Sequence, residues 1–427
     1  MSRERQGWVI VAALFVTLTF GFGAVVNTSG VFFTPLIKYF GWSRMRLSSV
    51  ALIDAAAAVA FVPVVGWLLD RLKTQIIIGA GAAMVALGLL VLSRVESFNQ
   101  FVLCHALVLV PGMSACGVLP VSFVVANWFD ERRGRVFGIV MLGSSFGGMI
   151  MQIPITWLIS HSSWRTGYLA MMAPVVVIVI PVVLLVVRAR PPQSKPLPAA
   201  GRNRGAPART DPGAGLVGYE LSEALKSRSF WMLASAHFAY AFSVGSLVVH
   251  GIPYLIHAGY SSESAALVAT VTLVLAATGK LVLPPWADRV TGRIALVVNF
   301  CLSAVGIAAL FWAGHYVWLL AVYVLAFGLS GGAPLALLPM VQVESLGIRR
   351  FGSIGGILGV MASVAGSTGP LLTGRIFDVT NSYDSALVML FVVAIAGAVA
   401  TLAITPFAAG CEVVRQAAPE TASAIPQ

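Results

Sequence analysis

The chain has 427 residues, of which 58% are hydrophobic and only 10% are charged. A soluble domain has about 25% charged residues, because its surface must meet water. This composition, with a mean hydropathy of +0.91, excludes a soluble globule, a disordered chain, a collagen and a disulfide scaffold. The formal net charge of +11 comes from short loops between apolar runs, so it indicates membrane topology and not nucleic-acid binding.

Twelve apolar runs predict twelve transmembrane helices, since a spanning helix needs about 20 apolar residues. Their approximate ranges are 8–37, 47–69, 75–93, 98–127, 135–160, 166–187, 230–257, 264–287, 294–313, 316–343, 352–376 and 385–408. The first run is too long for a cleaved signal peptide, so we expect it to be the first spanning helix. The cysteines (Cys104, Cys116, Cys301 and Cys411) have no paired spacing, which favours packing roles over a disulfide or a metal site.

A polar segment divides the twelve runs into two sets of six. Residues 188–228 contain six prolines and eight Lys or Arg residues, a composition that cannot span a membrane and need not fold. We therefore predict an N-terminal bundle at 1–187, a cytoplasmic linker at 188–228, a C-terminal bundle at 229–410 and a disordered cytoplasmic tail at 411–427.

The basic residues predict the orientation of the chain. With both termini in the cytoplasm, the inner segments contain 20 Lys and Arg residues and the outer segments contain six. This excess follows the positive-inside rule. The remaining basic residue, Lys280, falls within an apolar run.

The two halves contain related motifs. A loop at 66–71 reads Gly-Trp-Leu-Leu-Asp-Arg and a loop at 285–289 reads Pro-Trp-Ala-Asp-Arg, which places Asp70 and Asp288 218 residues apart. Glycine-rich segments at 138–143 and 355–359 are 217 residues apart. One offset for two separate pairs indicates a duplicated six-helix unit, which is the plan of a large class of secondary transporters.

These motifs resemble those of the major facilitator superfamily. The loop at 66–71 is similar to the superfamily's signature between helices two and three, although Leu72 and Lys73 depart from it. The loop at 288–293 fits the pattern better, and the segment at 128–135 resembles the inner loop after helix four. The resemblance implies an all-α membrane fold and a gating role for Asp70, Arg71, Arg133, Asp288, Arg289 and Arg293. The alternative is that these charges only set the topology.

A narrower resemblance begins in the first run. The segment at 27–35 (Asn-Thr-Ser-Gly-Val-Phe-Phe-Thr-Pro), followed by Phe-Gly-Trp-Ser-Arg at 40–44, is similar to the opening of monocarboxylate transporters and oxalate/formate antiporters. This branch moves small carboxylates with a proton or by exchange. A basic residue in helix eight usually binds the carboxylate, and Lys280 matches that position.

Lys280 also stands out without the family. A lysine at depth costs about 2.5–3.5 kcal/mol, and this one lies eight residues before Asp288, about 12 Å from the inner helix end. Small neighbours leave room for a ligand, and no carboxylate lies in the same run. We expect Lys280 to bind an anionic substrate. The alternatives are snorkelling and a cross-helix partner such as Asp54.

Asp54 and His250 are the candidates for proton coupling. Asp54 is the one acid well inside a run, about 24 Å from the inner end, where burial would favour its protonated form. It could equally stay ionised in an outer vestibule. His250 lies beside Gly251 and Pro253, which loosen the helix, and it could contact a carboxylate or be satisfied by a backbone carbonyl.

The remaining substrate-binding candidates are polar residues in apolar surroundings. They are Asn27, Thr28, Gln152 and Tyr383. Each could bond instead across helices. His237 is a weaker candidate and His105 a weaker one still.

Departures from the resembling families limit what they imply. Asn27 stands where the eukaryotic monocarboxylate carriers usually have a lysine, and Ala276 stands where they have an aspartate. Their proton-relay scheme therefore does not carry over. The lysine that the oxalate exchanger has in helix eleven is also missing, and one buried base favours a monocarboxylate over a dicarboxylate.

The sequence thus predicts a multi-pass transporter of small monocarboxylates, coupled to protons, that alternates access by rocking of its halves in a bacterial inner membrane. The expected partners are a small carboxylate, a proton and the lipid bilayer, for a monomer without a cofactor, a metal or nucleic acid. The alternatives are an anion exchanger, a drug-efflux carrier and a sugar carrier. No pattern typical of an enzyme appears.

Overall fold

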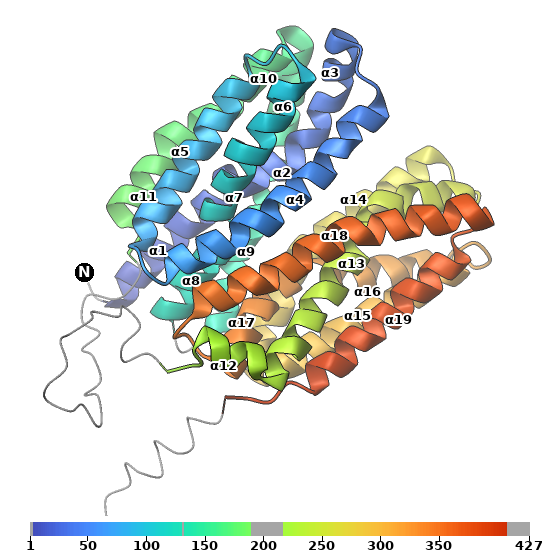
Figure 1. The fold of residues 1–427 in the computed structure, drawn as a ribbon. Helices are drawn as coiled ribbons and strands as arrows, with labels where there is room; N and C mark the ends of the chain where they lie inside the picture. The colour runs from blue at the N-terminus through green and yellow to red at the C-terminus, as the bar shows by residue number, and fades with distance from the viewer. Residues whose placement is uncertain (1–2, 130–131, 189–216, 408–427) are drawn as a thin grey trace, which may run out of the picture.

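The computed structural model describes residues 3–129, 132–188 and 217–407. These residues form helices joined by short loops (Figure 1). Within them the one β-type pairing is an isolated antiparallel bridge between Gly218 and Gly347, and there is no strand. Lipid offers no partner to backbone groups, so a helix, which satisfies its own hydrogen bonds, is the expected element here.

The helices of the N-terminal half, residues 3–188, are α1 (Arg3–Val16), η1 (Thr17–Gly23), α2 (Ala24–Thr28), η2 (Ser29–Phe32), α3 (Phe33–Phe40), α4 (Arg44–Leu69), α5 (Thr74–Leu92), α6 (Phe98–Cys104), η3 (His105–Leu109), α7 (Val110–Cys116), α8 (Val118–Trp128), α9 (Arg133–His161), α10 (Trp164–Pro174), η4 (Val175–Val179) and α11 (Ile180–Val186). The helices of the C-terminal half, residues 217–407, are α12 (Leu221–Lys226), α13 (Arg228–His257), α14 (Ser262–Ala287), α15 (Gly292–Trp312), α16 (Leu319–Gly332), α17 (Pro334–Leu346), α18 (Phe351–Thr380) and α19 (Asp384–Leu402).

Eleven helical stretches of the described residues are long and apolar enough to cross a membrane, and the pair α16–α17 makes a twelfth if it counts as one span. Each lies within a few residues of a predicted run. The pair α16–α17 bends by 48° at Gly332 and Pro334, because proline has no N–H for the helical ladder. Three stretches contain wide π-helical turns, at η1, η3 and η4.

Hydroxyl side chains begin several spans. The hydroxyls of Ser43, Ser163, Ser227 and Ser261 accept hydrogen bonds from backbone N–H groups in the first turns of α4, α10, α13 and α14. Such caps satisfy donors that a helix leaves free at its N-terminus. These capping serines therefore mark where the helices begin, even where hydropathy changes gradually along the sequence.

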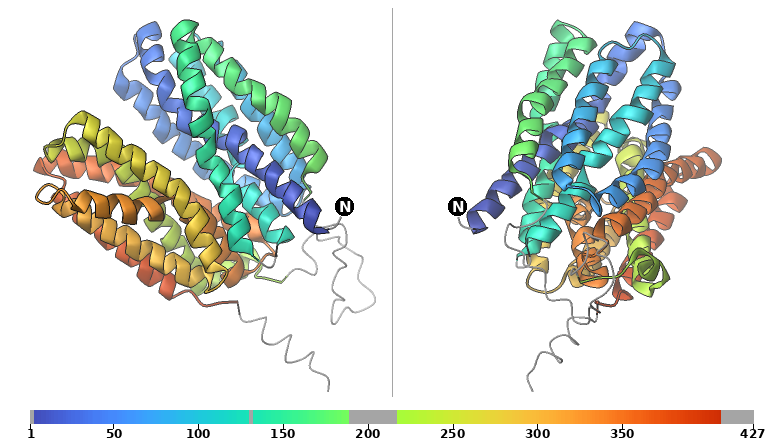
Figure 2. Two further views of the ribbon diagram at one scale, coloured as in Figure 1. Left: turned by 180° about the vertical axis from the view of Figure 1, so that it is seen from behind. Right: turned by 60° about the vertical axis from the view of Figure 1, so that its left-hand side comes forward.

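The two halves meet at one end and diverge toward the other (Figures 1 and 2). At the joined end α4 packs on α18, and α9 packs on α14. Glycines permit this approach: a Cβ at Gly66 would collide with the Gly352 carbonyl, and one at Gly134 would collide with the Pro284 carbonyl. Backbone of one half therefore touches backbone of the other, as small residues allow in membrane helices.

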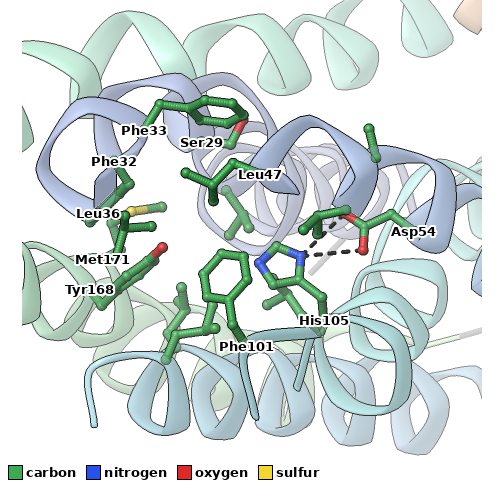
Figure 3. A pocket seen from close by; sticks show the side chains of 16 residues that line it. Ser29, Phe32, Phe33, Leu36, Leu47, Asp54, Phe101, His105, Tyr168 and Met171 are labelled. Atoms are coloured by element: carbon green, nitrogen blue, oxygen red, sulfur yellow. Dashed lines mark hydrogen bonds and ion pairs between the residues drawn. The ribbon is translucent and has the colours of Figure 1, made fainter. Parts of the chain in front are cut away.

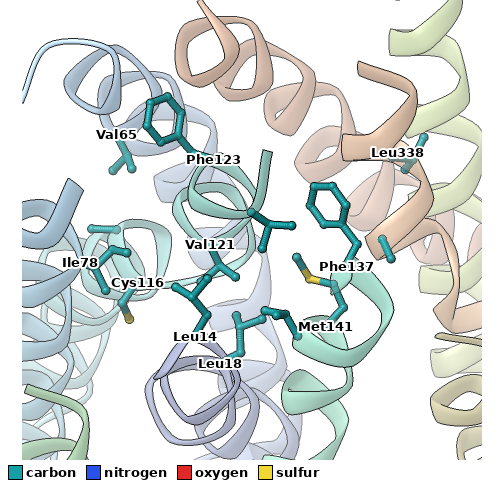
Figure 4. Packing of buried hydrophobic residues seen from close by; sticks show 14 of the residues in the cluster. Leu14, Leu18, Val65, Ile78, Cys116, Val121, Phe123, Phe137, Met141 and Leu338 are labelled. Carbon is teal, nitrogen blue, oxygen red and sulfur yellow. The ribbon is translucent and has the colours of Figure 1, made fainter. Parts of the chain in front are cut away.

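The apolar core extends across the joined end. Figure 4 shows Leu14, Val121 and Phe137 of the N-terminal half packed together, with Leu338 of α17 close by. Cys104 and Cys116 are buried, as a packing role requires, whereas Cys301 is exposed. Cys411 lies outside the described residues, as does the predicted tail from 411 onward.

Part of the predicted linker is folded in the structure. Residues 189–216 lie outside the described part, but 217–228 lie against the C-terminal half. The backbone N–H of Tyr219 donates to the Leu346 carbonyl at 3.0 Å, and Glu220 caps α12 and pairs with Arg349 and Arg350, each at 2.8 Å. The Glu220 carboxylate partly neutralises the charge of the two arginines, and these ion pairs stabilise residues 217–228 against the C-terminal half.

Candidate functional site

A cavity of about 520 Å³ lies between the two halves. Its volume falls within the range of about 300–1,000 Å³ typical of small-molecule sites. Apolar side chains of α4, α7, α8, α17 and α18 form most of its wall. The polar and titratable residues on it are Asp54, Ser114, Ser122, His237, Tyr240, Gln342 and Ser363.

Among these polar residues, Ser122 and Gln342 were not predicted from the sequence, and His237 was predicted only as a weaker candidate. Ser122 is buried and its hydroxyl has no hydrogen-bond partner among the described residues, so it is available to a ligand. The ring Nδ1 of His237 donates to the Leu233 carbonyl at 2.9 Å, and Gln342 donates to the Phe351 carbonyl at 2.8 Å. Serine and glutamine occur throughout helices, so the sequence held no signal that these positions share one cavity.

Lys280 connects the two halves of the chain. It is 3% exposed on α14, and its Nζ donates to the hydroxyls of Ser144 at 2.8 Å and Ser145 at 2.7 Å on α9. It neither snorkels nor pairs with Asp54. An ammonium has three donors, so one remains for another acceptor. Neither serine was a sequence candidate.

No carboxylate of the described residues lies within ion-pair distance of Lys280. The lysine stem lies beside Gly332, where a Cβ would be 3.1 Å from Lys280 Cε. The next residue back, Gly331, accepts a hydrogen bond at 3.2 Å from the cavity-lining Tyr240. Lys280 is thus an uncompensated buried cation one layer behind the cavity wall, an arrangement that favours an anion nearby.

Of the polar candidates in the first and fifth spans, Asn27 lies nearest this group. Its side chain donates to the Gly23 carbonyl at 2.7 Å and to the Ser144 carbonyl at 2.8 Å. Thr28 is buried and bonds the Ala24 carbonyl of its own helix at 2.6 Å. Gln152 is exposed and lines neither cavity. For Asn27 and Thr28 the structure favours the alternative that each bonds within the protein.

Asp54 pairs with His105. The two carboxylate oxygens lie 3.3 and 3.2 Å from His105 Nδ1. Both residues line a second, mainly apolar pocket of about 200 Å³ in the N-terminal half, with Tyr168, Met171 and Phe101 around it (Figure 3). The histidine ranked lowest from sequence is therefore the partner of the predicted acid.

His250 and Tyr383 lie together. His250 Nε2 is 2.9 Å from the Pro370 carbonyl, which is the backbone alternative left open by the sequence. The Tyr383 hydroxyl is 3.5 Å from Nδ1 of the same ring, and the Tyr383 ring stacks on Phe377 with centroids 4.3 Å apart. Neither residue lines either cavity, and the partners of His250 differ from those of Lys280.

The two repeat aspartates cap helices of the opposite half. Asp70 accepts from the N–H groups of Gly352 at 3.0 Å and Ser353 at 2.8 Å, at the start of α18. Asp288 accepts from the N–H groups of Gly134 at 2.6 Å and Arg135 at 2.9 Å, at the start of α9. A carboxylate is favoured there by free donors and the helix dipole. Burial nevertheless raises the pKa of Asp70, and the hydrogen bonds from Ser353 and Gly352 oppose that rise.

Three of the predicted gating arginines make contacts with groups other than the two aspartates. The Arg71 guanidinium lies over the Trp67 ring, 4.1 Å from its centroid. Arg133 donates to the Phe129 and Ala126 carbonyls, and Arg293 donates to the Ile404 carbonyl at 2.7 Å. Arg289 is exposed. The contacts of Asp70 and Asp288 described above are made with backbone N–H groups of the opposite half.

Comparison with known proteins identifies the family. The family profile described as Major Facilitator Superfamily matches residues 13–370. Monocarboxylate transporter 12 of Homo sapiens is 24% identical over 405 residues, which cover 90% of this chain and 77% of that protein. Monocarboxylate transporter 13 of Bos taurus is 24% identical over 401 residues, covering 93% and 89%.

Solved structures have the same fold. The fucose:proton symporter FucP of E. coli superposes with a TM-score of 0.68 at 14% identity, covering 94% of this chain and 99% of that one. The human organic anion transporter MFSD10 gives a TM-score of 0.68 at 14% identity, covering 94% and 100%. The chain is a multi-pass integral membrane transporter and not an enzyme, and it belongs to the Major Facilitator Superfamily.

Proposed function

We propose that this protein is a secondary transporter of small monocarboxylates, coupled to protons. Its relatives named monocarboxylate transporters support the substrate class. The observation that carries the proposal is Lys280, a buried ammonium with two hydroxyl partners and no carboxylate among the described residues. A monocarboxylate would supply the missing negative charge.

In this proposal the carboxylate accepts the third Nζ hydrogen of Lys280. Ser145 takes part as well, because its hydroxyl accepts from Lys280 and is free to donate to a carboxylate oxygen. The apolar wall of the cavity receives the remainder of the acid, and the unpartnered Ser122 hydroxyl can bond a second polar group of the substrate. Gln152, Thr28, His250 and Tyr383 have no direct role in this arrangement.

The transport cycle would follow from two six-helix bundles, 1–187 and 229–410, with both termini in the cytoplasm. The excess of basic residues on the Asp70 and Asp288 side supports this orientation. The joined end then faces the cytoplasm, and the cavity faces outward. Rocking of the halves would open the Asp70 and Asp288 contacts and close the opposite end.

The test is uptake of radiolabelled monocarboxylates into proteoliposomes, with and without an inward proton gradient. Wild type should accumulate at least one acid, and Lys280→Ala should reduce uptake at least a hundredfold, because a buried charged hydrogen bond is worth about 1.5–3 kcal/mol and the ion pair adds to it. Lys38→Ala is the control, since Lys38 is an exposed lysine of α3.

Two outcomes would contradict the proposal. Uptake that survives Lys280→Ala would remove the carboxylate site but leave a transporter. Failure to transport any monocarboxylate, with uptake of a sugar or a lipophilic drug instead, would replace the substrate class.

A further inference from the structure

Asp54 and His105 form a contact between two spans of the N-terminal half. Asp54 belongs to α4, and His105 opens the π-helical turn η3. Their side chains are 31% and 14% exposed. Figure 3 shows the imidazole directed at the carboxylate from the opposite wall of the small pocket. A wide turn of this kind interrupts the regular helix and is often found at functional sites.

Asp54 lines both cavities, so its carboxylate stands between the cavity shared by the halves and the small pocket. Among the described residues that line either one, Asp54 is the only side chain with a formal charge at neutral pH. The titratable groups facing it are His105 from η3, Tyr168 from α10, and His237 and Tyr240 from α13. The lining residues of α5, α7, α8, α17 and α18 contribute none.

We propose that the Asp54–His105 pair is the proton-binding site of the transport cycle, on the half of the chain opposite Lys280. The inference rests on the proposed function for its substrate. It differs from a single-acid scheme because the pair holds the proton jointly: imidazole is the one side chain that ordinarily changes charge between pH 5 and 8, and the Asp54 carboxylate lies 3.2 Å from its Nδ1.

The proton balance is simple. One proton leaves water in the shared cavity and binds the pair, so that a neutral imidazole and a carboxylate become an imidazolium and a carboxylate. The pair changes from a charge of −1 to zero. After the halves rock, the same proton returns to water on the other side.

Charge explains why the proton and the anion would travel together. With Lys280 charged and the pair unprotonated, the empty sites sum to zero. Anion alone leaves −1, proton alone leaves +1, and both together restore zero. A net charge in a desolvated site is costly, so the half-loaded carrier is disfavoured when the halves move.

The experiment separates coupling from transport. Proteoliposomes loaded with unlabelled substrate measure exchange, and empty ones with an inward proton gradient measure accumulation. Asp54→Asn and His105→Gln should keep exchange within about threefold of wild type and lose at least tenfold in proton-driven accumulation. Asp54→Asn should also make uptake respond to membrane potential, since the anion then moves without a compensating proton.

His161→Gln is the matched control, because His161 is an exposed histidine of α9 that contacts Trp157 and Ser160 near the end of that helix. Proton-driven accumulation that is unchanged in both Asp54→Asn and His105→Gln overturns the inference and leaves the transporter intact. Exchange in wild type without any proton-driven accumulation also overturns it.

A readout without substrate keeps the inference testable if no monocarboxylate is transported. In ¹⁵N-histidine spectra of the purified protein, one ring-nitrogen signal should move with pH between 5 and 8, be absent in His105→Gln and be altered in Asp54→Asn. A His105 signal that stays in place over that range excludes proton uptake by the pair.

Discussion

At the residue scale, the cation Lys280 and the acid Asp54 lie on different halves of the molecule. Lys280 is held by hydroxyls and Asp54 by an imidazole, so neither neutralises the other. Direct pairing would have been the cheaper arrangement for stability alone. Keeping the two charges apart leaves each free for a ligand of opposite charge.

The hydroxyls of Ser144 and Ser145 stabilise the substrate-free protein. Because each bonds a buried ammonium, the double variant Ser144→Ala/Ser145→Ala should lose about 3–6 kcal/mol at most, at about 1.5–3 kcal/mol per bond. We expect a lower melting temperature in detergent, partly restored by saturating monocarboxylate. Ser49→Ala removes an exposed hydroxyl that bonds only its own helix, and an equal melting temperature in the two proteins would refute the role of the pair.

At the element scale, two helix N-termini meet carboxylates of the opposite half. The cap of α18 by Asp70 and the cap of α9 by Asp288 occupy equivalent places in the repeats. A cap contributes about 0.5–2 kcal/mol. These caps therefore stabilise the contact between the halves at the joined end, in addition to the glycine contacts.

We expect Asp70→Ala, which removes the acceptor of both hydrogen bonds, to shift the halves toward opening of the joined end by about two- to thirtyfold, the factor that corresponds to one cap. Spin labels on Leu72→Cys and Val217→Cys, both exposed near this end, would report the shift as a longer distance. The labelled protein needs Cys301 and Cys411 replaced by serine. An unchanged distance distribution would mean that the cap does not hold this end.

The same contact should respond to pH. Burial raises the pKa of Asp70 above its ordinary 3.8, whereas opening would expose the carboxyl and lower that pKa again. The closed end therefore binds the proton more tightly, so acidification from neutral pH favours it, and the advantage disappears as pH rises through the raised pKa. Asp70→Asn should abolish this component of the pH response in the same distance measurement.

The sequence was most informative about elements. The helix bounds follow the predicted runs because lipid requires long apolar stretches, and hydropathy records that requirement directly. Lys280 was visible because a lysine in such a run is costly. Its serine partners and the pairing of His105 with Asp54 were not, since those contacts depend on how α9, α14, α4 and η3 are rotated against one another. Glu220 and Glu223 do form a capping-box pattern, which is a signal that could have indicated α12.

At the scale of the whole molecule, transport by rocking requires the joined end to separate. A Cβ at Gly359 would lie 3.9 Å from Val62 Cβ across the halves, within the range of about 3.5–4.5 Å found in disulfides. The double variant Val62→Cys/Gly359→Cys should therefore form a disulfide on oxidation. Uptake should fall at least tenfold and recover with a reducing agent, whereas Val62→Cys alone should not respond. Full uptake with the bridge formed would rule out separation at this site.

The duplicated aspartate caps have a kinetic consequence. The Asp70 and Asp288 caps act in parallel, and both must break at the same moment before the joined end can separate. Their contributions to the opening barrier therefore add, and the end stays closed when only one cap breaks. The lifetime of the closed end should then depend on the product of two rare events, and replacing both aspartates should shorten that lifetime by about the product of the two single effects. In such a carrier the joined end opens rarely and separates fully when it does. Little solute therefore passes through uncoupled between turnovers.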